Sequence, residues 1–255
     1  MPAHLFDLTA KVVVVTGGGG GLGFGMAEAM AGLGATVSLW GRNAEKLKAA
    51  AEKIGASYEV CDVADEAAVD DAFAATLARC GRVDGMFANA GVTGAAKLST
   101  DRSAEEWRRL FAANLDGVVH CFRAAARHMD ERAAAGDAGG RLIATSSVAS
   151  VFGAARNEHY GASKGAVNSL VRALAVEQAR FGVTVNAILP GYAESDMTER
   201  LMTNEKFVNA VTPRIPMRRF GVPGDYGGIA AYLMSEASSY HTGQCFVIDG
   251  GYTVF

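Results

Sequence analysis

Apolar, β-branched runs alternate with helix-like segments along nearly the whole chain, and this alternation restricts the fold more than any other feature. Helical periodicity is clear in Ala44–Lys53, Glu66–Ala78 and Ala104–Ala135, which are rich in Ala, Glu, Lys and Arg. Strands without polar interruption are typical of a parallel sheet covered on both faces. The pattern predicts an α/β fold with a doubly wound, seven-stranded parallel sheet and helices on both faces. The expected strands are Val12–Thr16, Thr36–Trp40, Ser57–Cys61, Gly85–Ala88, Arg141–Ser146, Thr184–Leu189 and Cys245–Asp249.

Length and charge limit the kinds of protein that fit. A chain of 255 residues with 50% hydrophobic composition can form one large domain, and no repeat or linker divides residues 1–255. The net charge of −3 is spread along the chain, so we expect no nucleic-acid or membrane partner. Residues 1–11 lack a signal-peptide pattern, and the four cysteines are far apart. These features favour a cytoplasmic protein with reduced thiols and no metal site.

Proline is concentrated in residues 190–223, which contain four of the five prolines. Such a segment should be irregular or broken helix. In a doubly wound sheet, ligands bind beyond the carboxyl ends of the strands, and Pro190 follows a predicted strand. We therefore expect residues 190–223 to cover a ligand. An ordinary surface excursion is the alternative.

A glycine-rich turn follows the first predicted strand and leads into a helix that begins near Phe24. Glycines there let the backbone approach a pyrophosphate, which the N-terminus of the next helix stabilises. A Walker P-loop is excluded because no Lys-Ser/Thr follows the last glycine. Two registers stay open at this point: GxGxxG at Gly18, Gly20 and Gly23, or TGxxxGxG at Thr16, Gly17, Gly21 and Gly23.

The end of the second predicted strand bears on the choice of dinucleotide. It reads Trp40-Gly41-Arg42-Asn43. An acidic residue at this place would hold the adenosine ribose hydroxyls and repel a 2′-phosphate. Glycine occupies the place here and arginine follows, so Arg42 favours NADP(H), with NAD(H) as the alternative. Arg42 could equally be a solvated residue at a helix start.

Tyr160 and Lys164 stand four residues apart in Tyr160-Gly161-Ala162-Ser163-Lys164. On a helix this spacing places both side chains on one face. An ammonium group one turn from a phenol favours the phenolate and lowers a tyrosine pKa that starts at about 10. Tyr160 then becomes a candidate general acid or base. The spacing alone is weak evidence, because a surface pair would also show it.

With these residues in place, the chain resembles the short-chain dehydrogenase/reductase family, in its short single-domain branch with a Rossmann fold. The resemblance selects the Thr16, Gly17, Gly21, Gly23 register. It implies an NAD(P)(H)-dependent oxidoreductase that interconverts a secondary alcohol and a ketone by hydride transfer. The motifs that carry it, in order, are Thr16-Gly17…Gly21…Gly23, Asp62-Val63, Asn89-Ala90-Gly91, Asn114, Ser147, Tyr160…Lys164, Pro190-Gly191 and Asp249-Gly250-Gly251.

The resemblance also implies a role for each catalytic residue. Tyr160 would give its proton to the carbonyl oxygen as hydride arrives, or remove it during oxidation. Lys164 would lower the pKa of Tyr160 and hydrogen-bond the nicotinamide ribose. Ser147 would donate a hydrogen bond to the substrate oxygen. Asn114, a poor helix former inside a predicted helix, would support a water that links the lysine to solvent.

The cofactor contacts follow in the same way. Asp62 and Val63 would meet the adenine, Asn89–Gly91 would lie beside the adenosine ribose, and Pro190-Gly191 would line the nicotinamide. Plainer interpretations are a helix cap for Asp62 and turn or strand-end roles for Asn89 and Ser147. The implied cofactor set is Thr16, Gly17, Gly21, Leu22, Gly23, Arg42, Asp62, Val63, Asn89, Ala90, Gly91, Tyr160, Lys164, Pro190, Gly191, Ala193 and Ser195.

The chain departs from the family pattern at a few places. Gly20 stands where many NADP-preferring relatives have arginine, which weakens the NADP(H) prediction. Ala193 replaces a larger aliphatic residue, and Ser195 replaces threonine. His159 beside the tyrosine invites an acid/base role but is more typical of a supporting residue. The pair Arg218-Arg219 could meet an anionic substrate or be structural.

The substrate stays open. A 3-oxoacyl thioester or a bulky cyclic ketone is favoured by four apolar residues in the proline-rich segment: Met197, Leu201, Met202 and Phe207. A sugar, polyol or sugar-acid dehydrogenase is the alternative. A dinucleotide-binding sensor without turnover is disfavoured, because cofactor binding alone requires neither Ser147 nor Tyr160. The family usually forms homotetramers through the helices that carry Asn114 and Tyr160, so a homotetramer is expected here. The sequence does not give the physiological direction of the reaction.

Overall fold

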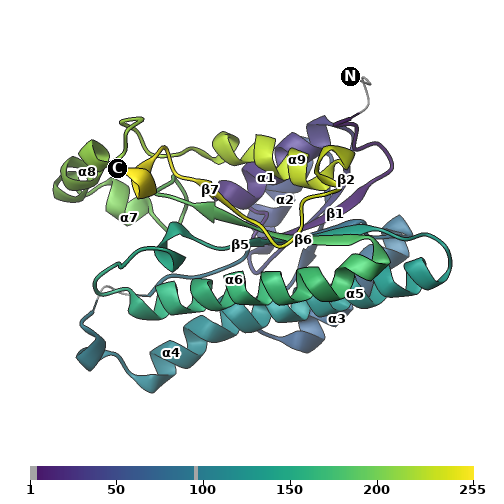
Figure 1. The fold of residues 1–255 in the computed structure, drawn as a ribbon, viewed down its shortest axis with the longest axis horizontal. Helices are drawn as coiled ribbons and strands as arrows, with labels where there is room; N and C mark the ends of the chain where they lie inside the picture. Colours follow the sequence, from purple (N-terminus) through teal and green to yellow (C-terminus); the bar gives the residue numbers. More distant parts are fainter. Residues whose placement is uncertain (1–4, 95–96) are drawn as a thin grey trace.

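The computed structural model describes residues 5–94 and 97–255, so the first four residues of the 1–11 segment lie outside the described part (Figure 1). Its centre is a seven-stranded parallel sheet with the order β3-β2-β1-β4-β5-β6-β7, which confirms the predicted fold class. The strands are β1 (Val12–Thr16), β2 (Thr36–Gly41), β3 (Ser57–Val60), β4 (Gly85–Ala88), β5 (Gly140–Thr145), β6 (Val183–Pro190) and β7 (Cys245–Ile248).

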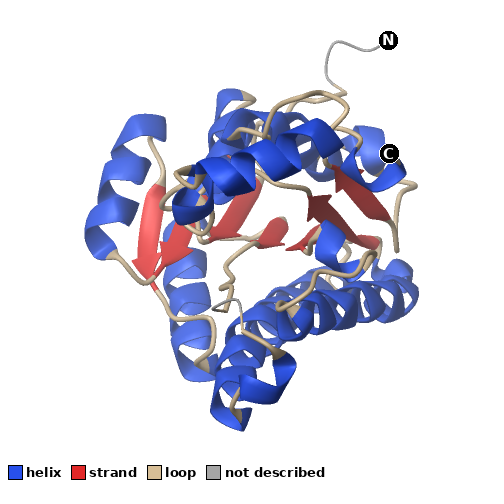
Figure 2. Ribbon diagram, turned by 90° about the vertical axis from the view of Figure 1, so that its left-hand side faces the viewer, coloured by secondary structure: helices blue, strands red, loops and turns tan. Residues whose placement is uncertain are grey.

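Helices cover both faces of the sheet, as Figures 1 and 2 show. Helices α1, α2 and α9 bury apolar side chains against one face, and α3, α5 and α6 against the other. No helix in residues 5–94 and 97–255 is long and apolar enough to cross a membrane. The helices are α1 (Gly21–Gly32), α2 (Ala44–Ile54), α3 (Glu66–Cys80), α4 (Ala104–Phe111), α5 (Gly117–Ala134), α6 (Glu158–Gln178), α7 (Glu199–Met202), α8 (Glu205–Val211) and α9 (Gly227–Met234).

Strand β1 shows why an unbroken apolar run forms a central strand. Successive side chains point to opposite faces of a sheet. Val12 and Val14 pack in the core under α3, α5 and α6, whereas Val13 and Val15 pack in the core under α1, α2 and α9. All four valines are buried. In a strand with one solvent-exposed face, apolar and polar residues would alternate. The uninterrupted run of valines therefore fits a strand that is buried on both faces.

The predicted helix over Ala104–Ala135 is not a single regular helix. Helix α4 starts with a capping box between Ser103 and Glu106, and a π-helical turn at Ala112–Asp116 separates it from α5. A π turn holds one residue more than a regular turn and is frequent at functional sites. This one carries Asn114, whose side chain bonds outside its own helix.

Residues 190–223 form a broken excursion beyond the sheet, as the prolines predict. After β6 ends at Pro190, the segment contains the short helices α7 and α8 and a 3-10 turn at Thr212–Arg214. The segment closes on itself where Ala193 pairs with Gly221 in an isolated bridge. Within it, Tyr192 packs against Phe207 and Phe220 in a small aromatic cluster apart from the two main cores.

Candidate active site

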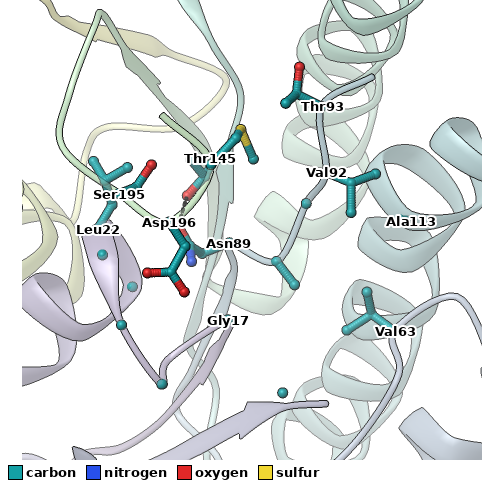
Figure 3. Close-up of a pocket in the computed structure, with 18 of the residues that line it drawn as sticks. Gly17, Leu22, Val63, Asn89, Val92, Thr93, Ala113, Thr145, Ser195 and Asp196 are labelled. Carbon is teal, nitrogen blue, oxygen red and sulfur yellow. Dashed lines mark hydrogen bonds between the residues drawn. The ribbon is translucent and has the colours of Figure 1, made fainter. Parts of the chain in front are cut away.

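A cavity of about 650 Å³ lies beyond the carboxyl ends of the strands (Figure 3). Its wall takes segments that follow β1, β2, β3, β4, β5 and β6, around the point where the strand order reverses between β1 and β4. A switch point of this kind is where doubly wound sheets bind ligands. The predicted residues on the wall are Gly17, Gly21, Leu22, Gly23, Arg42, Asp62, Val63, Asn89, Ala90, Gly91, Ser147, Tyr160, Lys164, Pro190, Gly191, Ala193 and Ser195.

The glycine turn admits side chains at some positions and not at others. Gly17 and Gly21 have positive φ angles of +65° and +52°, which strain any L side chain. A Cβ on Gly23 would lie 2.4 Å from the Gly17 carbonyl oxygen. Gly20 has open space around it. Gly18 is crowded too, because a Cβ there would lie 2.9 Å from the Val15 carbonyl oxygen. The positive φ angles of Gly17 and Gly21 are what fit the TGxxxGxG register, and the bare backbone leaves room for a pyrophosphate at the start of α1. A dinucleotide fits this cradle.

Thr16 is not on the cavity wall, although it was predicted there. Its Oγ1 accepts hydrogen bonds from the backbone N–H groups of Asn89 and Ala90, both at 2.9 Å. The Asn89 side chain donates to the Thr16 carbonyl at 2.9 Å and accepts from Thr145 at 3.0 Å. Thr16 thus ties the end of β1 to the end of β4, and it supports the glycine turn from behind.

Ser147, Tyr160 and Lys164 meet on one side of the cavity. Helix α6 presents Tyr160 and Lys164 one turn apart, and Ser147 follows the end of β5. The Lys164 side chain is buried, and its Nζ donates to the Thr145 carbonyl at 2.8 Å. The same Nζ lies 5.8 Å from the centre of the Tyr160 ring. Predicted spacing and observed geometry agree here.

The electrostatics of the pair differ from the sequence-based prediction. Burial raises the pKa of Tyr160 above its ordinary value, and a hydrogen bond with Ser147 opposes the rise. Burial also lowers the pKa of Lys164 to about 8. The net effect on the phenol is therefore a raised pKa, opposite in direction to the lowering expected from Lys164. Its physical reason is that both groups lose water, and desolvation disfavours the charged form of each.

Asn114 lies behind the cavity wall, not on it. Its Oδ1 accepts from the Val92 N–H at 2.8 Å, and its Nδ2 donates to the Val92 carbonyl at 2.9 Å and to Ser163 Oγ at 3.2 Å. These bonds join the segment after β4 to helix α6. A Cβ on Gly91 would lie 3.1 Å from Asn114 Oδ1 and 3.5 Å from Lys164 Nζ. The fully buried amide thus fixes the backbone beside the lysine.

The expected adenosine end of the cavity carries the charges predicted for it. Arg42 follows β2 and Asp62 follows β3, and Arg42 Nη1 lies 3.8 Å from Asp62 Oδ2. Both side chains are exposed, and both line the cavity. The Asp62 side chain accepts from the Ala64 N–H, whereas Asp65 caps α3. The helix-cap interpretation of Asp62 is therefore wrong.

Three further residues noted in the sequence do not line the cavity. His159 Nε2 is 2.9 Å from Arg102 Nη1, and the ring is buried. Arg219 pairs with Asp225 at 2.6 Å, and Arg218 donates to the Pro213 carbonyl. His159, Arg218 and Arg219 therefore have structural contacts.

Several lining residues were missed by sequence reasoning. Lys46 and Asp196 form an ion pair at the cavity, although they are far apart in the chain. Thr145 lines the cavity, and its backbone carbonyl accepts the hydrogen bond from Lys164. A backbone contact of this kind cannot be predicted from the residue type. Val92 and Met197 add apolar wall. For Lys46 the available signal was a lysine in the first turn of a helix, where a positive charge is unfavourable.

Comparison with known proteins agrees with this site. A family model described as enoyl-(acyl carrier protein) reductase matches residues 17–253. Gluconate 5-dehydrogenase of Gluconobacter oxydans (strain 621H) is 37% identical over 255 residues, with 98% of this chain and 97% of that protein covered.

Two solved structures share the fold over nearly their full length. A gluconate 5-dehydrogenase from Burkholderia cenocepacia J2315, in complex with NADP and tartrate, has a TM-score of 0.92 at 32% identity, with 98% of each chain covered. A 3-ketoacyl-(acyl-carrier-protein) reductase from Brucella melitensis, complexed with NADH, has a TM-score of 0.89 at 33% identity, with 96% of this chain and 99% of that one covered. The chain belongs to the short-chain dehydrogenase/reductase family and is an NAD(P)-dependent oxidoreductase that interconverts CH–OH and C=O groups.

Proposed function

We propose that this oxidoreductase uses NADP(H), acts on a bulky ketone or its secondary alcohol, and employs Tyr160 as general acid/base. The observation that carries the proposal is the meeting of Ser147, Tyr160 and Lys164 on one side of a cavity whose other side is the glycine turn. A cofactor cradle and a proton donor then face one space. The separation of the cofactor cradle from the proton donor suits a reaction in which hydride and proton reach the carbonyl from different groups.

The chain's own residues divide the work of the reaction. A bound nicotinamide supplies the hydride in reduction and accepts it in oxidation. Tyr160, whose pKa burial raises above its ordinary value, is protonated and holds the proton for the carbonyl oxygen. Ser147 donates a hydrogen bond to the same oxygen as charge develops there. Lys164, fixed by the Thr145 carbonyl, keeps a positive charge beside the phenol below pH of about 8.

The preference for NADP(H) rests on the end of β2. Gly41 offers no carboxylate to repel a 2′-phosphate, and Arg42 lines the cavity beside it. Gly20 has open space where an arginine would add a second cation, so Arg42 carries more of the discrimination here. We expect Arg42→Ala to weaken NADPH binding about tenfold and NADH binding less than twofold. Equal losses for both dinucleotides would contradict this reading.

The substrate assignment rests on the charges of the wall. Among the described residues of the wall, the basic ones are Arg42, Lys46 and Lys164. Arg42 and Lys46 lie near the start of α2, and Lys164 lies beside Tyr160. None of the three is therefore in a position to bind a substrate carboxylate. Val92 and Met197 provide apolar surface instead. These features support a 3-oxoacyl thioester or a bulky cyclic ketone.

A sugar-acid dehydrogenase is the second candidate. Gluconate 5-dehydrogenases appear among both the sequence relatives and the structural neighbours. Thr93 adds a hydroxyl to the wall that could hydrogen-bond a polyol.

A homotetramer is also proposed, with the paired helices α5 and α6 as contact surface. A groove of about 220 Å³ lies between them, lined by apolar residues such as Leu170 and Leu174 and by charged residues such as Arg127 and Glu177. Val176 on the same pair is 83% exposed. A groove with both apolar and charged lining, beside an exposed apolar side chain, supports contact with a second copy of the chain. Light scattering of the purified protein should give a mass near four chains, and a monomer would contradict the assignment.

The experiment that tests the activity follows loss of the reduced-nicotinamide absorbance with NADPH or NADH across a ketone panel. The panel contains a 3-oxoacyl thioester mimic, a bulky cyclic ketone and a 5-keto sugar acid. We expect the highest kcat/KM with NADPH and one of the first two. Turnover of the keto sugar acid alone would favour the second candidate, and no turnover on any compound would contradict both substrate assignments.

A further inference from the structure

An ion pair spans two distant parts of the cavity wall. Lys46 lies in the first turn of α2, and Asp196 lies in residues 190–223 beyond β6. Lys46 Nζ is paired with Asp196 Oδ2, and both residues line the cavity. Figure 3 shows Asp196 and Ser195 beside the glycine turn that carries Gly17 and Leu22.

The pair lies next to the glycine turn. A Cβ on Gly19 would lie 3.4 Å from the Cβ of Lys46, so the lysine starts against the turn. A Cβ on Gly21 would lie 3.2 Å from the Cβ of Ser195, the neighbour of Asp196. Lysine and aspartate therefore meet beside the backbone that is shaped to receive phosphate.

The start of α2 is an unusual place for two cations. A helix N-terminus carries partial positive charge, which favours acidic residues there and disfavours Lys or Arg. Arg42 and Lys46 nevertheless both lie at this helix start and both line the cavity. Each has a carboxylate partner on another segment of the wall: Asp62, after the neighbouring strand β3, for the arginine, and Asp196, in residues 190–223, for the lysine. The arrangement gathers positive charge at the cavity and balances it with two exposed carboxylates.

Phosphate can easily replace Asp196 as the partner of Lys46. The side chains are 56% and 73% exposed, and exposed ion pairs contribute little to stability. A phosphate group offers the ammonium several charged oxygens in a geometry that a single carboxylate does not match. Release of Asp196 into water carries little penalty, because most of its surface is already solvated.

We propose that Lys46 binds a phosphate of the dinucleotide, and that Asp196 holds the lysine in place until that phosphate arrives. The inference rests on the proposed use of NADP(H), and it assigns a second phosphate-binding cation beside Arg42. Two phosphate sources are available in that cofactor, the pyrophosphate and the 2′-phosphate. Both would engage the ammonium by the same chemistry.

The test measures the binding of NADPH and of NADH to Lys46→Met, Asp196→Asn and the double variant. Nucleotide fluorescence reports the binding, and no turnover is needed. Lys46→Met should weaken NADPH binding about tenfold. Asp196→Asn should tighten it about twofold to threefold, because the lysine loses its competing partner. The double variant should bind like Lys46→Met alone. Lys48→Met, the same charge change at an exposed site of α2 off the cavity wall, is the control and should bind like wild type.

The outcomes separate the possibilities. A loss with NADPH only assigns Lys46 to the 2′-phosphate, and an equal loss with NADH assigns it to the pyrophosphate. Wild-type affinity in Lys46→Met overturns the proposal. Weakening by Asp196→Asn to the same extent as by Lys46→Met also overturns it, since the pair would then be merely structural. Wild-type protein that binds neither dinucleotide would refute the proposed function itself, whereas normal wild-type binding with unaffected variants refutes only this inference.

Discussion

Two parts of the cavity wall are built on different principles. In the first, the glycine turn and the segment after β4 are fixed by backbone contacts, with so little space that a Cβ on Gly23 would overlap the Gly17 carbonyl. In the second, residues 190–223 contain short helices held by side chains such as Tyr192 and Phe207. Met197 lines the cavity from this segment and is partly exposed. A wall built from crowded backbone should not accept a side chain where a Cβ would overlap, as at Gly23, and a wall built from side chains should adapt to different substrates.

The largest effect is expected at Tyr160, which lines the cavity. Tyr160→Phe removes the proton donor and keeps the ring, so kcat should fall about a thousandfold. Affinity for NADPH should stay within about threefold, because the cradle is untouched. The two quantities are measured by steady-state kinetics and by nucleotide fluorescence. Substantial turnover in this variant would remove Tyr160 from the mechanism.

The backbone wall is tested by Gly23→Ala, which places a methyl group 2.4 Å from the Gly17 oxygen. We expect at least tenfold weaker NADPH binding and a loss of about 2–3 kcal/mol in the free energy of unfolding. Gly20→Ala is the matched control, because nothing lies within 4 Å of its Cβ. Chemical denaturation and cofactor titration measure both. If the two variants behaved alike, the turn would not be constrained by its backbone.

The charge of Lys164 is tested by pH. Burial lowers its pKa to about 8, so the ammonium is present below that pH and is lost as pH rises through it. Tyr160 stays protonated in the same range, because its pKa is raised. For reduction, kcat/KM for NADPH should fall up to tenfold per pH unit above about 8. Lys164→Arg keeps the charge and should move this fall to higher pH. A profile that stays flat to high pH in wild type would contradict the role of the ammonium.

The side-chain wall should give the smallest effect. Met197→Ala enlarges the cavity from residues 190–223, and we expect KM for a bulky ketone to change about threefold while NADPH affinity is unchanged. Met217→Ala in the same segment is the control, since Met217 is exposed and does not line the cavity. A large loss of cofactor binding in Met197→Ala would show that both walls depend on side chains alike.

The same contrast explains what could be read from the sequence. Strands β1 and β4 were predicted with their observed bounds, because continuous apolar runs and flanking turn residues are local signals. Helical spacing placed Tyr160 and Lys164 on one face, and the resemblance to the family gave that pair its expected role. The glycine register follows from steric limits on single residues, and only the resemblance or the structure could select it.

Other features depend on contacts that no local pattern contains. The π turn that breaks Ala104–Ala135 adds one residue to a helix without changing its composition. The raised pKa of Tyr160 depends on how deeply the assembled fold buries the phenol. The pairing of Lys46 with Asp196 joins segments from opposite halves of the chain. The division into one domain over 1–255 and the covering role of 190–223 stay predictions.

The most direct test of the account follows the hydrogen itself. NADPH with deuterium at both C4 positions of the nicotinamide would be incubated with the best ketone and with wild-type or Tyr160→Phe protein, and the product alcohol analysed by mass spectrometry. One deuterium is expected on the carbinol carbon with wild type, and bound but unreacted NADPH with the variant. Solvent hydrogen on that carbon, or labelled product at the wild-type rate from Tyr160→Phe, would contradict the account.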